Sequence, residues 1–408
     1  MPELSTDHSS ATLEGAHSHG GPRYVSSRAD RPTSFDPADI PVPRGREEEW
    51  RFTPMKRFAP LFDLDTIRAA TAAGEAAAAA GAIRIETDLP DGARLETVPR
   101  SDARIGTVGA PVDRTGITAW NGTETATVLT LESGAQLERA ARLNVVGQDA
   151  QLARPTAQHI LVAAESGAKG TVVLDHTGTA ALTQGVEVTV ADGAELTLVT
   201  VQGWEDAAVH ASNHRVKVSG RGVLKHVVVS LGGDVRICPD LGFSGEGGHI
   251  DAYGVYFTDA GQHQEHRPYV AHTEPHCYSR VTYKGALQGE GAHAVWVGDC
   301  LIGQAARGTD TYELNRNLVL TEGAKADSVP NLEIENGNIE GAGHASATGR
   351  FDDQQLFYLR ARGIPETEAR RLVVLGFFNE IVAEIGVDEV EERLMAAIEK
   401  ELELTGLI

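Results

Sequence analysis

The most informative segment for the fold is GVEVTVADGAELTLVTV, residues 185–201. Valines occupy every second position from Val186 to Val190, and Glu187 and Thr189 stand between them. This is the period-2 pattern of a β-strand with one buried face. A short Asp-Gly-Ala turn follows, and leucines then resume the alternation. Two strands joined by a glycine turn predict a β-rich body.

Similar glycine turns recur along the chain, each before a strand-like stretch. They are ESGAQL at 132, ESGAKG at 165, ADGAEL at 191, SGRGVL at 219, GEGGHI at 245, GEGAHA at 289 and TEGAKA at 321. Degenerate repeats of about 25–35 residues without helical periodicity are typical of β-solenoid coils. A β-sandwich or jelly roll also has many short strands and is the alternative fold.

Four regions follow from the changes in pattern along the chain. Residues 1–35 are rich in His, Ser, Pro and Gly and predict a disordered arm. Residues 36–82 predict an N-terminal helical region, in which the aromatic residues of GREEEWRFTPMKRFAPLF pack on a core and an Ala-rich helix follows. Residues 83–345 predict the solenoid, and residues 346–408 a C-terminal helical domain.

The C-terminal domain shows clear helix boundaries. Gly363 ends one helix and Pro365 begins the next, as expected for Gly just past a helix end and Pro just inside a helix start. Apolar residues at helical spacing continue beyond them and predict about three helices in total. We expect these helices to cap the open end of the solenoid, because exposed strand edges need cover.

Composition limits the possible partners and the cellular compartment. The formal charge of −22 disfavours nucleic acid and anionic membranes, which are bound by clustered Lys and Arg. No lysine is followed by Ser or Thr, so the phosphate loop of ATPases is missing and we expect no ATP site in this chain. There are three cysteines, no apolar signal segment and no long apolar run, and we therefore expect a cytoplasmic protein that does not enter a membrane.

No motif for catalysis within a single chain stands out. The densest group of possible metal ligands lies in residues 262–280, but its histidines and cysteine lack the matched spacing of a structural zinc site. Asp299, Asp310 and Glu313 are the nearest candidates for the carboxylates of a carbohydrate-cleaving β-helix, and they share no clear coil register. No nucleophile elbow occurs. We therefore expect a protein that is not an enzyme.

His344 is the one candidate metal ligand that stands apart. It lies in PNLEIENGNIEGAGHASATGR, residues 330–350, among Gly, Ala, Ser and Thr. A lone histidine is most often structural, but small neighbours leave space for a partner or an inorganic group. Its place after the last predicted coil would allow a second subunit to complete a site.

Several segments together resemble the SufB/SufD family of iron–sulfur cluster assembly proteins, and the SufD-type members in particular. They are GREEEWRFTP (45–54), HTEPHCYSRVTYKGAL (272–287), ELNRNLVL (313–320), residues 330–350 quoted above and DDQQLFYLRARGIPETEARRL (352–372). The resemblance covers most of the chain from about residue 40 onward. It implies a right-handed parallel β-helix core with flanking N- and C-terminal helical regions.

The resemblance also implies a scaffold role with a SufB-type paralogue and a SufC-type ATPase. The family's site histidine falls on His344, which would hold a transient iron–sulfur cluster shared with the partner. SufB-type members have a cysteine where this chain has Asn315, and some relatives have one where this chain has Ala342. The residues assigned to partner binding are Asn315, Asn317, Leu356, Tyr358, Arg370, Arg371, Phe377 and Phe378, with the ATPase docking around 352–385.

Two other classes remain open at this stage. An autonomous β-helix that binds or cleaves carbohydrate would act without partners, and a self-assembling structural solenoid would form homopolymers. A homodimer that competes with the heterocomplex is also possible. Three scattered cysteines cannot easily hold a four-thiolate cluster, so a scaffold of this kind would depend on its partner for thiolates.

Overall fold

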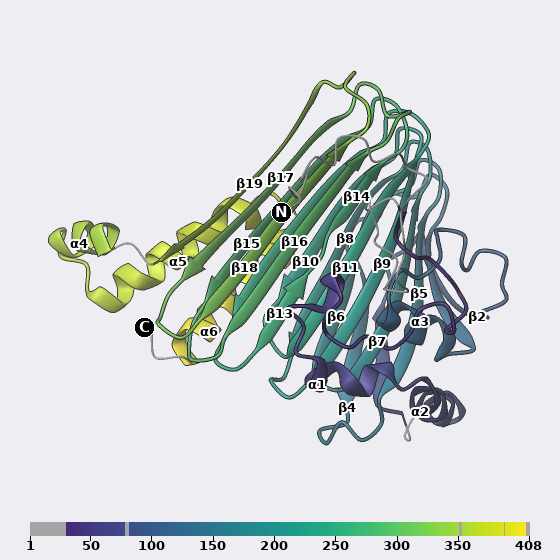
Figure 1. Ribbon diagram of the computed structural model, residues 1–408, viewed down its shortest axis with the longest axis horizontal. Helices are drawn as coiled ribbons and strands as arrows, with labels where there is room; N and C mark the ends of the chain where they lie inside the picture. The colour runs from purple at the N-terminus through teal and green to yellow at the C-terminus, as the bar shows by residue number, and fades with distance from the viewer. Residues whose placement is uncertain (1–29, 78–80, 351–352, 387, 405–408) are drawn as a thin grey trace, which may run out of the picture.

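The computed structural model describes residues 30–77, 81–350, 353–386 and 388–404. Its body is a β-solenoid of about eight turns, in which each turn adds one strand to each of two facing sheets (Figure 1). The solenoid prediction is confirmed, and the alternative of a sandwich or jelly roll is wrong. Apart from the first strands of each sheet, neighbouring strands are parallel and in register.

One sheet has nine strands and the other has ten. The nine-stranded sheet runs, in spatial order, through β1 (Ile83–Asp88), β4 (Ala141–Gln148), β6 (Lys169–Thr179), β8 (Glu195–Trp204), β10 (Val223–Ser230), β12 (His249–Thr258), β15 (Tyr278–Leu287), β17 (Asp310–Val319) and β19 (Gly341–Arg350). The ten-stranded sheet contains β2 (Ala93–Pro99), β3 (Thr125–Leu131), β5 (Thr156–Ala164), β7 (Ala181–Val190), β9 (Val209–Ser219), β11 (Asp234–Ser244), the short β13 (His263–His266) and β14 (Tyr269–His272), β16 (His293–Ile302) and β18 (Lys325–Ile334).

Apolar side chains from both sheets meet inside the solenoid and form its largest core cluster. Val186, Val188 and Val190 of β7 belong to this cluster, as their alternation predicted. Glu187 between them is buried as well, because the outer face of β7 is covered by other elements. The period of the strand was therefore readable from the sequence, but the cover on its outer face was not.

The predicted glycine turns lie at two edges of the coils. Those at 132, 165, 191, 219 and 245 lead from the ten-stranded to the nine-stranded sheet, and those at 289 and 321 lead back. Gly134, Gly167 and Gly193 all have φ near +70°, a conformation that residues with a Cβ rarely adopt. The amide of Gly134 donates to the carbonyl of Ser166 in the next coil (3.0 Å). Equivalent turns therefore stack, and this explains the repeat in the sequence.

Elements from residues 48–76, together with α3, which follows β2, cover the outer face of the ten-stranded sheet. They are two 3-10 turns (Glu48–Trp50 and Ala59–Phe62), α1 (Met55–Phe58), α2 (Leu64–Ala76) and α3 (Arg114–Asn121). Trp50, Phe58 and Phe62 pack against Val209 and Ala211 of β9, which confirms the predicted aromatic docking. Helix α3, which packs on β5, β7 and β9, was not predicted from the sequence.

The C-terminal helices cover the opposite outer face. They are α4 (Asp353–Ala361), α5 (Glu366–Val382) and α6 (Asp388–Leu404), which agrees with the three helices expected. Phe378 and Ile398 from α5 and α6 share a buried cluster with Val227, Val255 and other residues of the nine-stranded sheet. The prediction that these helices cap the open end of the solenoid is wrong: α5 lies along the sheet, and α4 projects beyond it (Figure 1).

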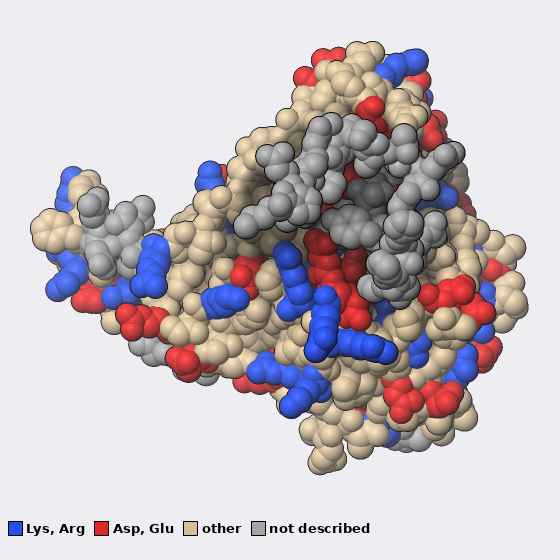
Figure 2. Space-filling model, viewed as in Figure 1, with Lys and Arg blue, Asp and Glu red and all other residues tan. Residues whose placement is uncertain are grey.

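The two ends of the solenoid differ. At the start of the solenoid, β1 and β2 pair antiparallel with β4 and β3. At the other end, β18 and β19 form the last turn, and most of their residues are half-buried or exposed. Figure 2 shows acidic and basic side chains interspersed over one face of the molecule. Among the described residues, no helix is both long and apolar enough to cross a membrane.

Candidate functional site

His344 lies on β19, the edge strand of the last turn, and its side chain is exposed. The residues around it show which way it points. Ser346 donates to Ser328 of β18 on the facing sheet (2.7 Å), and Ala342 packs beside Cys300 of β16. Side chains alternate along a strand, so His344 faces the interior with these two neighbours. It remains exposed because β19 is the last strand of its sheet in the part of the chain that the structure describes.

Asn315 and Asn317 lie inside the same end of the solenoid and are almost fully buried, at 0% and 3% exposure. The Asn315 side chain donates to the Tyr256 hydroxyl (2.9 Å) and accepts from Asn317 (2.7 Å) and Ser328 (2.8 Å). Since Ser328 also accepts from Ser346, a chain of hydrogen bonds connects the interior to the exposed edge. Direct contact of the two asparagines with a partner stays a prediction, and in this arrangement Ser346 reaches the surface in their place.

Glu313 and Cys300 also point into the interior at this end. Glu313 is 1% exposed, and neither of its carboxylate oxygens has a hydrogen-bond partner among the described residues. Burial, reinforced by the charge of Asp299, raises the pKa of Glu313 well above its usual range. Burial also raises the pKa of Cys300 to about 12, so this thiol stays protonated. From the sequence, Glu313 was a candidate only as a catalytic carboxylate, and no pattern connected it with His344.

The three carboxylates considered for carbohydrate cleavage do not share a cleft. Asp310 points outward and pairs with Arg280 (2.9 Å), whereas Glu313 faces the interior. Asp299 lies on the outer side of the other sheet, where it accepts from Asn331 (2.8 Å). The sheets therefore separate the groups that such chemistry would need side by side.

The histidines of residues 262–280 are dispersed by the strands that carry them. His263 lies between Glu265 and His293, whereas His266 bonds to Ser230 and His272 to Ser279. The described residues contain no group of three or more His, Cys, Asp or Glu side chains that could hold a metal ion. The histidines of this segment therefore do not converge on one site.

The residues predicted for docking on the C-terminal helices fall into two groups. Leu356 and Phe378 are buried, at 6% and 0% exposure, and Phe377 is half-buried beside Lys284. Tyr358 is 57% exposed, and its neighbour Phe357 is 74% exposed. The exposed aromatic side chains of α4 are thus the accessible part of the predicted surface.

Arg370 and Arg371 are held within the helical domain. Arg370 pairs with Glu366 on its own helix (3.1 Å), and Arg371 pairs with Glu368 and with Glu399 of α6. Charge reversal at these arginines would place like charges together inside the domain. Their role in docking stays a prediction, and α4 offers a cleaner test of it.

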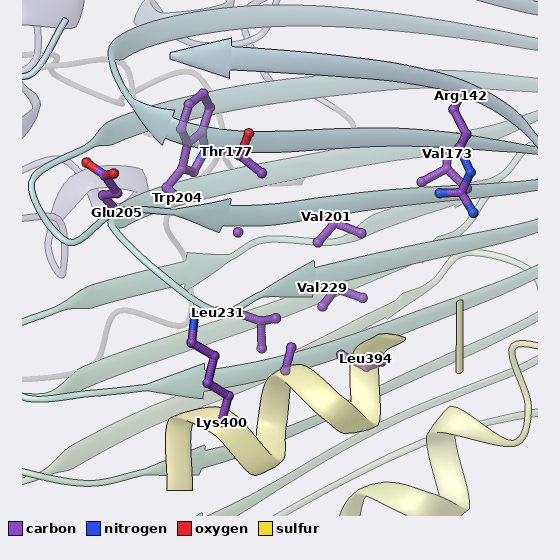
Figure 3. A pocket seen from close by; sticks show the side chains of 12 residues that line it. Arg142, Val173, Thr177, Val201, Trp204, Glu205, Val229, Leu231, Leu394 and Lys400 are labelled. Carbon is purple, nitrogen blue, oxygen red and sulfur yellow. The ribbon is translucent and has the colours of Figure 1, made fainter. Parts of the chain in front are cut away.

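A cavity of about 370 Å³ lies between α6 and the outer face of the nine-stranded sheet (Figure 3). Val173, Val201 and Val229 form its floor, and Leu394 and Lys400 of α6 stand over it. The cavity and the inward-facing His344 therefore lie on opposite faces of this sheet. It is a packing seam between helix and sheet, and it brings together none of the predicted site residues.

Comparison with known proteins gives consistent matches. A family model described as "SUF system FeS cluster assembly, SufBD core domain" matches residues 145–377. An iron–sulfur cluster assembly SufBD family protein of Mycobacterium tuberculosis is 49% identical over 379 residues, which cover 91% of this chain and 92% of the relative. A protein of the same description from Mycobacterium leprae is 46% identical over 91% of this chain and 93% of its own. The iron–sulfur cluster assembly protein SufD of Bacillus subtilis is 28% identical over 60% of this chain and 57% of its own.

Proposed function

The chain belongs to the SufBD family of iron–sulfur cluster assembly proteins, and from this premise we propose that it is a non-catalytic scaffold subunit of a cytoplasmic assembly complex. In this proposal its last solenoid turn meets a SufB-type paralogue, and its C-terminal helices bind a SufC-type ATPase. A nascent cluster forms where the two solenoids meet. His344 contributes an imidazole, and the partner contributes thiolates.

The open last turn is the observation that carries the proposal. Within the described ranges, the strands at this end have no neighbour on one side, and exposed strand edges readily pair with another chain. His344 and Ser346 are exposed on the interior-facing side of β19, where a second solenoid end would cover them. A cluster held by one imidazole here and by thiolates of a partner would be bound weakly enough to be passed on.

The first experiment tests the seam between the two solenoids. Tagged full-length chain is purified from its native cells, and a paralogous β-solenoid and an ABC-type ATPase should copurify. Ser346→Arg should abolish recovery of the paralogue, because a long charged side chain would fill the interior-facing side of the last turn. Ala347→Arg is the matched control, since Ala347 is also exposed but points to the other face of the strand.

Two outcomes would count against this seam. Recovery of the paralogue with the Ser346→Arg variant at the parent level would place the contact elsewhere. Recovery of a second copy of this chain alone, without a paralogue, would replace the heterocomplex by a homodimer.

The second experiment tests the ATPase surface. Tyr358→Ser on α4 should reduce copurification of the ATPase while the paralogue is retained. Val42→Ser is the control, because Val42 is similarly exposed (50%) but belongs to the N-terminal region. Equal recovery of the ATPase with both variants would exclude α4 as the docking surface.

A further inference from the structure

We propose that Glu313 is the second ligand that this chain provides, beside His344, for a ferrous ion at the open end of the solenoid. The inference rests on the proposed function and deepens it, since it names the metal species and the donor pair that receive it. Iron would then be bound by a carboxylate and an imidazole of this subunit before the partner supplies thiolates.

The position of the Glu313 side chain is the first argument. The residue is 1% exposed, yet both carboxylate oxygens lack a hydrogen-bond partner among the described residues. A buried carboxyl without partners destabilises a fold. Other buried carboxylates of this chain are satisfied: Glu265 contacts Arg236 and Thr53, and Glu187 contacts His159. Glu313 differs from these two in that neither oxygen has a partner among the described residues, and a cation would supply one.

The register of the last two strands is the second argument. Glu313 of β17 and His344 of β19 are direct Cα partners in a parallel ladder. Side chains of such a pair point to the same face, about 4.8 Å apart. At this spacing a carboxylate oxygen and an imidazole nitrogen can converge on one metal ion. Ala342, Ser346 and Thr348 of β19 face the same interior, so the backbone already directs His344 toward Glu313.

The third argument concerns the groups at the site, since the chemistry of the two donors determines which metal ion fits. The Sγ atom of Cys300 lies 3.5 Å from the hydroxyl of Thr311, which precedes Glu313 on the same face of β17. Imidazole and carboxylate together suit Fe²⁺ and similar divalent transition metals rather than Ca²⁺, which prefers oxygen ligands only. Two donors leave several coordination positions for water and for a partner. This agrees with the finding that the described residues hold no complete metal site of three or more ligands.

The test measures metal binding by the purified full-length chain under anaerobic conditions, with Fe²⁺ by equilibrium dialysis and Co²⁺ by visible absorption. We expect Glu313→Gln and His344→Ala each to weaken binding of both ions by about tenfold or more, since each removes one of two donors. Glu340→Gln is the control, because Glu340 is exposed in the loop before β19. Thermal unfolding of each variant shows that it is folded.

A second substitution distinguishes loss of the metal ligand from loss of the fold. Glu313→Leu keeps the interior filled and apolar, so it should fold, unfold at a temperature no lower than the parent and show the same loss of metal binding. Unchanged binding of Fe²⁺ and Co²⁺ by both Glu313 variants would overturn the proposal, as would a parent chain that binds neither ion. Copurification of the paralogue and the ATPase with these variants is measured in parallel. If both partners copurify normally, failure of the metal test removes Glu313 as a ligand and leaves the scaffold role intact.

Discussion

Acidification should destabilise this fold through imidazoles buried in the solenoid, and His266 provides the sharpest test. His266 is 1% exposed, accepts or donates one hydrogen bond with Ser230 (2.9 Å) and stacks on Tyr256 with the ring centroids 4.8 Å apart. Burial lowers its pKa to about 3, although the charge of Glu265 acts in the opposite direction. In the unfolded chain an ordinary histidine has a pKa of about 6.5.

The sign and size of the effect follow from proton linkage. Between the two pKa values the unfolded chain binds a proton at this site and the folded chain does not, so stability falls as the pH falls below about 6.5. At about pH 5 the difference amounts to about 2 kcal/mol for this one residue, and at about pH 7.5 it is close to zero. The loss approaches its limit only near the folded pKa of about 3.

The measurement is urea unfolding of the parent and of His266→Gln at about pH 7.5 and about pH 5. The variant retains a polar group for Ser230 but cannot titrate, so its loss of unfolding free energy on acidification should be smaller than that of the parent by about 2 kcal/mol. Carboxylates elsewhere contribute equally to both proteins and cancel in this comparison. His249→Gln removes a partly exposed histidine that stacks on Tyr278 and serves as the control. An equal pH dependence in the parent and the His266 variant would refute the reasoning.

Three further predictions concern packing and the covering helices. Gly285→Ala should lower stability by about 1–3 kcal/mol or more, because its Cβ would lie 1.7 Å from the Tyr256 ring. Gly349→Ala, whose Cβ would have nothing within 4 Å, should have little effect. Thermal unfolding of the two variants measures the difference. Glu380→Gln should speed amide exchange in α5, because the buried ammonium of Lys284 would lose its negatively charged partner, and the exposed Glu392→Gln should leave the exchange unchanged. Asp113→Ala should lower the free energy of unfolding by about 3 kcal/mol, because it removes both the cap of α3 and the carboxylate that pairs with buried Arg236. Urea unfolding should show a smaller loss for Asp63→Ala at the exposed cap of α2. Similar losses for the two variants would contradict the role of the buried pair.

The coils were predictable because their signals are local. Alternation from Val186 to Val190 and the left-handed glycines at Gly134 and Gly167 depend only on residues next to one another in sequence. Gly363 and Pro365 likewise marked the boundary between α4 and α5. The eight-residue helix α3 gave no comparable signal, and most of its residues are buried against the sheet.

The outer layers could not be placed from sequence. Nothing in the pattern of α5 and α6 says which apolar surface they cover, and the open end of the solenoid and the face of the nine-stranded sheet were both plausible. The helices pack on the sheet because Val227, Val255 and Phe257 form an apolar outer surface that the helices bury together. Among the described elements, none of the C-terminal helices therefore covers the last turn.

By itself, the sequence determined the coil period, the helical C-terminus and the histidine at the end of the last coil. Only the tertiary structure showed that Glu313 stands beside His344, because 31 positions of chain separate them and the meeting depends on the register of β17 and β19. The same ladder decided that Asn315 is buried while Ser346 is exposed. Local patterns specify which strands form, whereas the neighbours of each side chain depend on how successive coils are stacked.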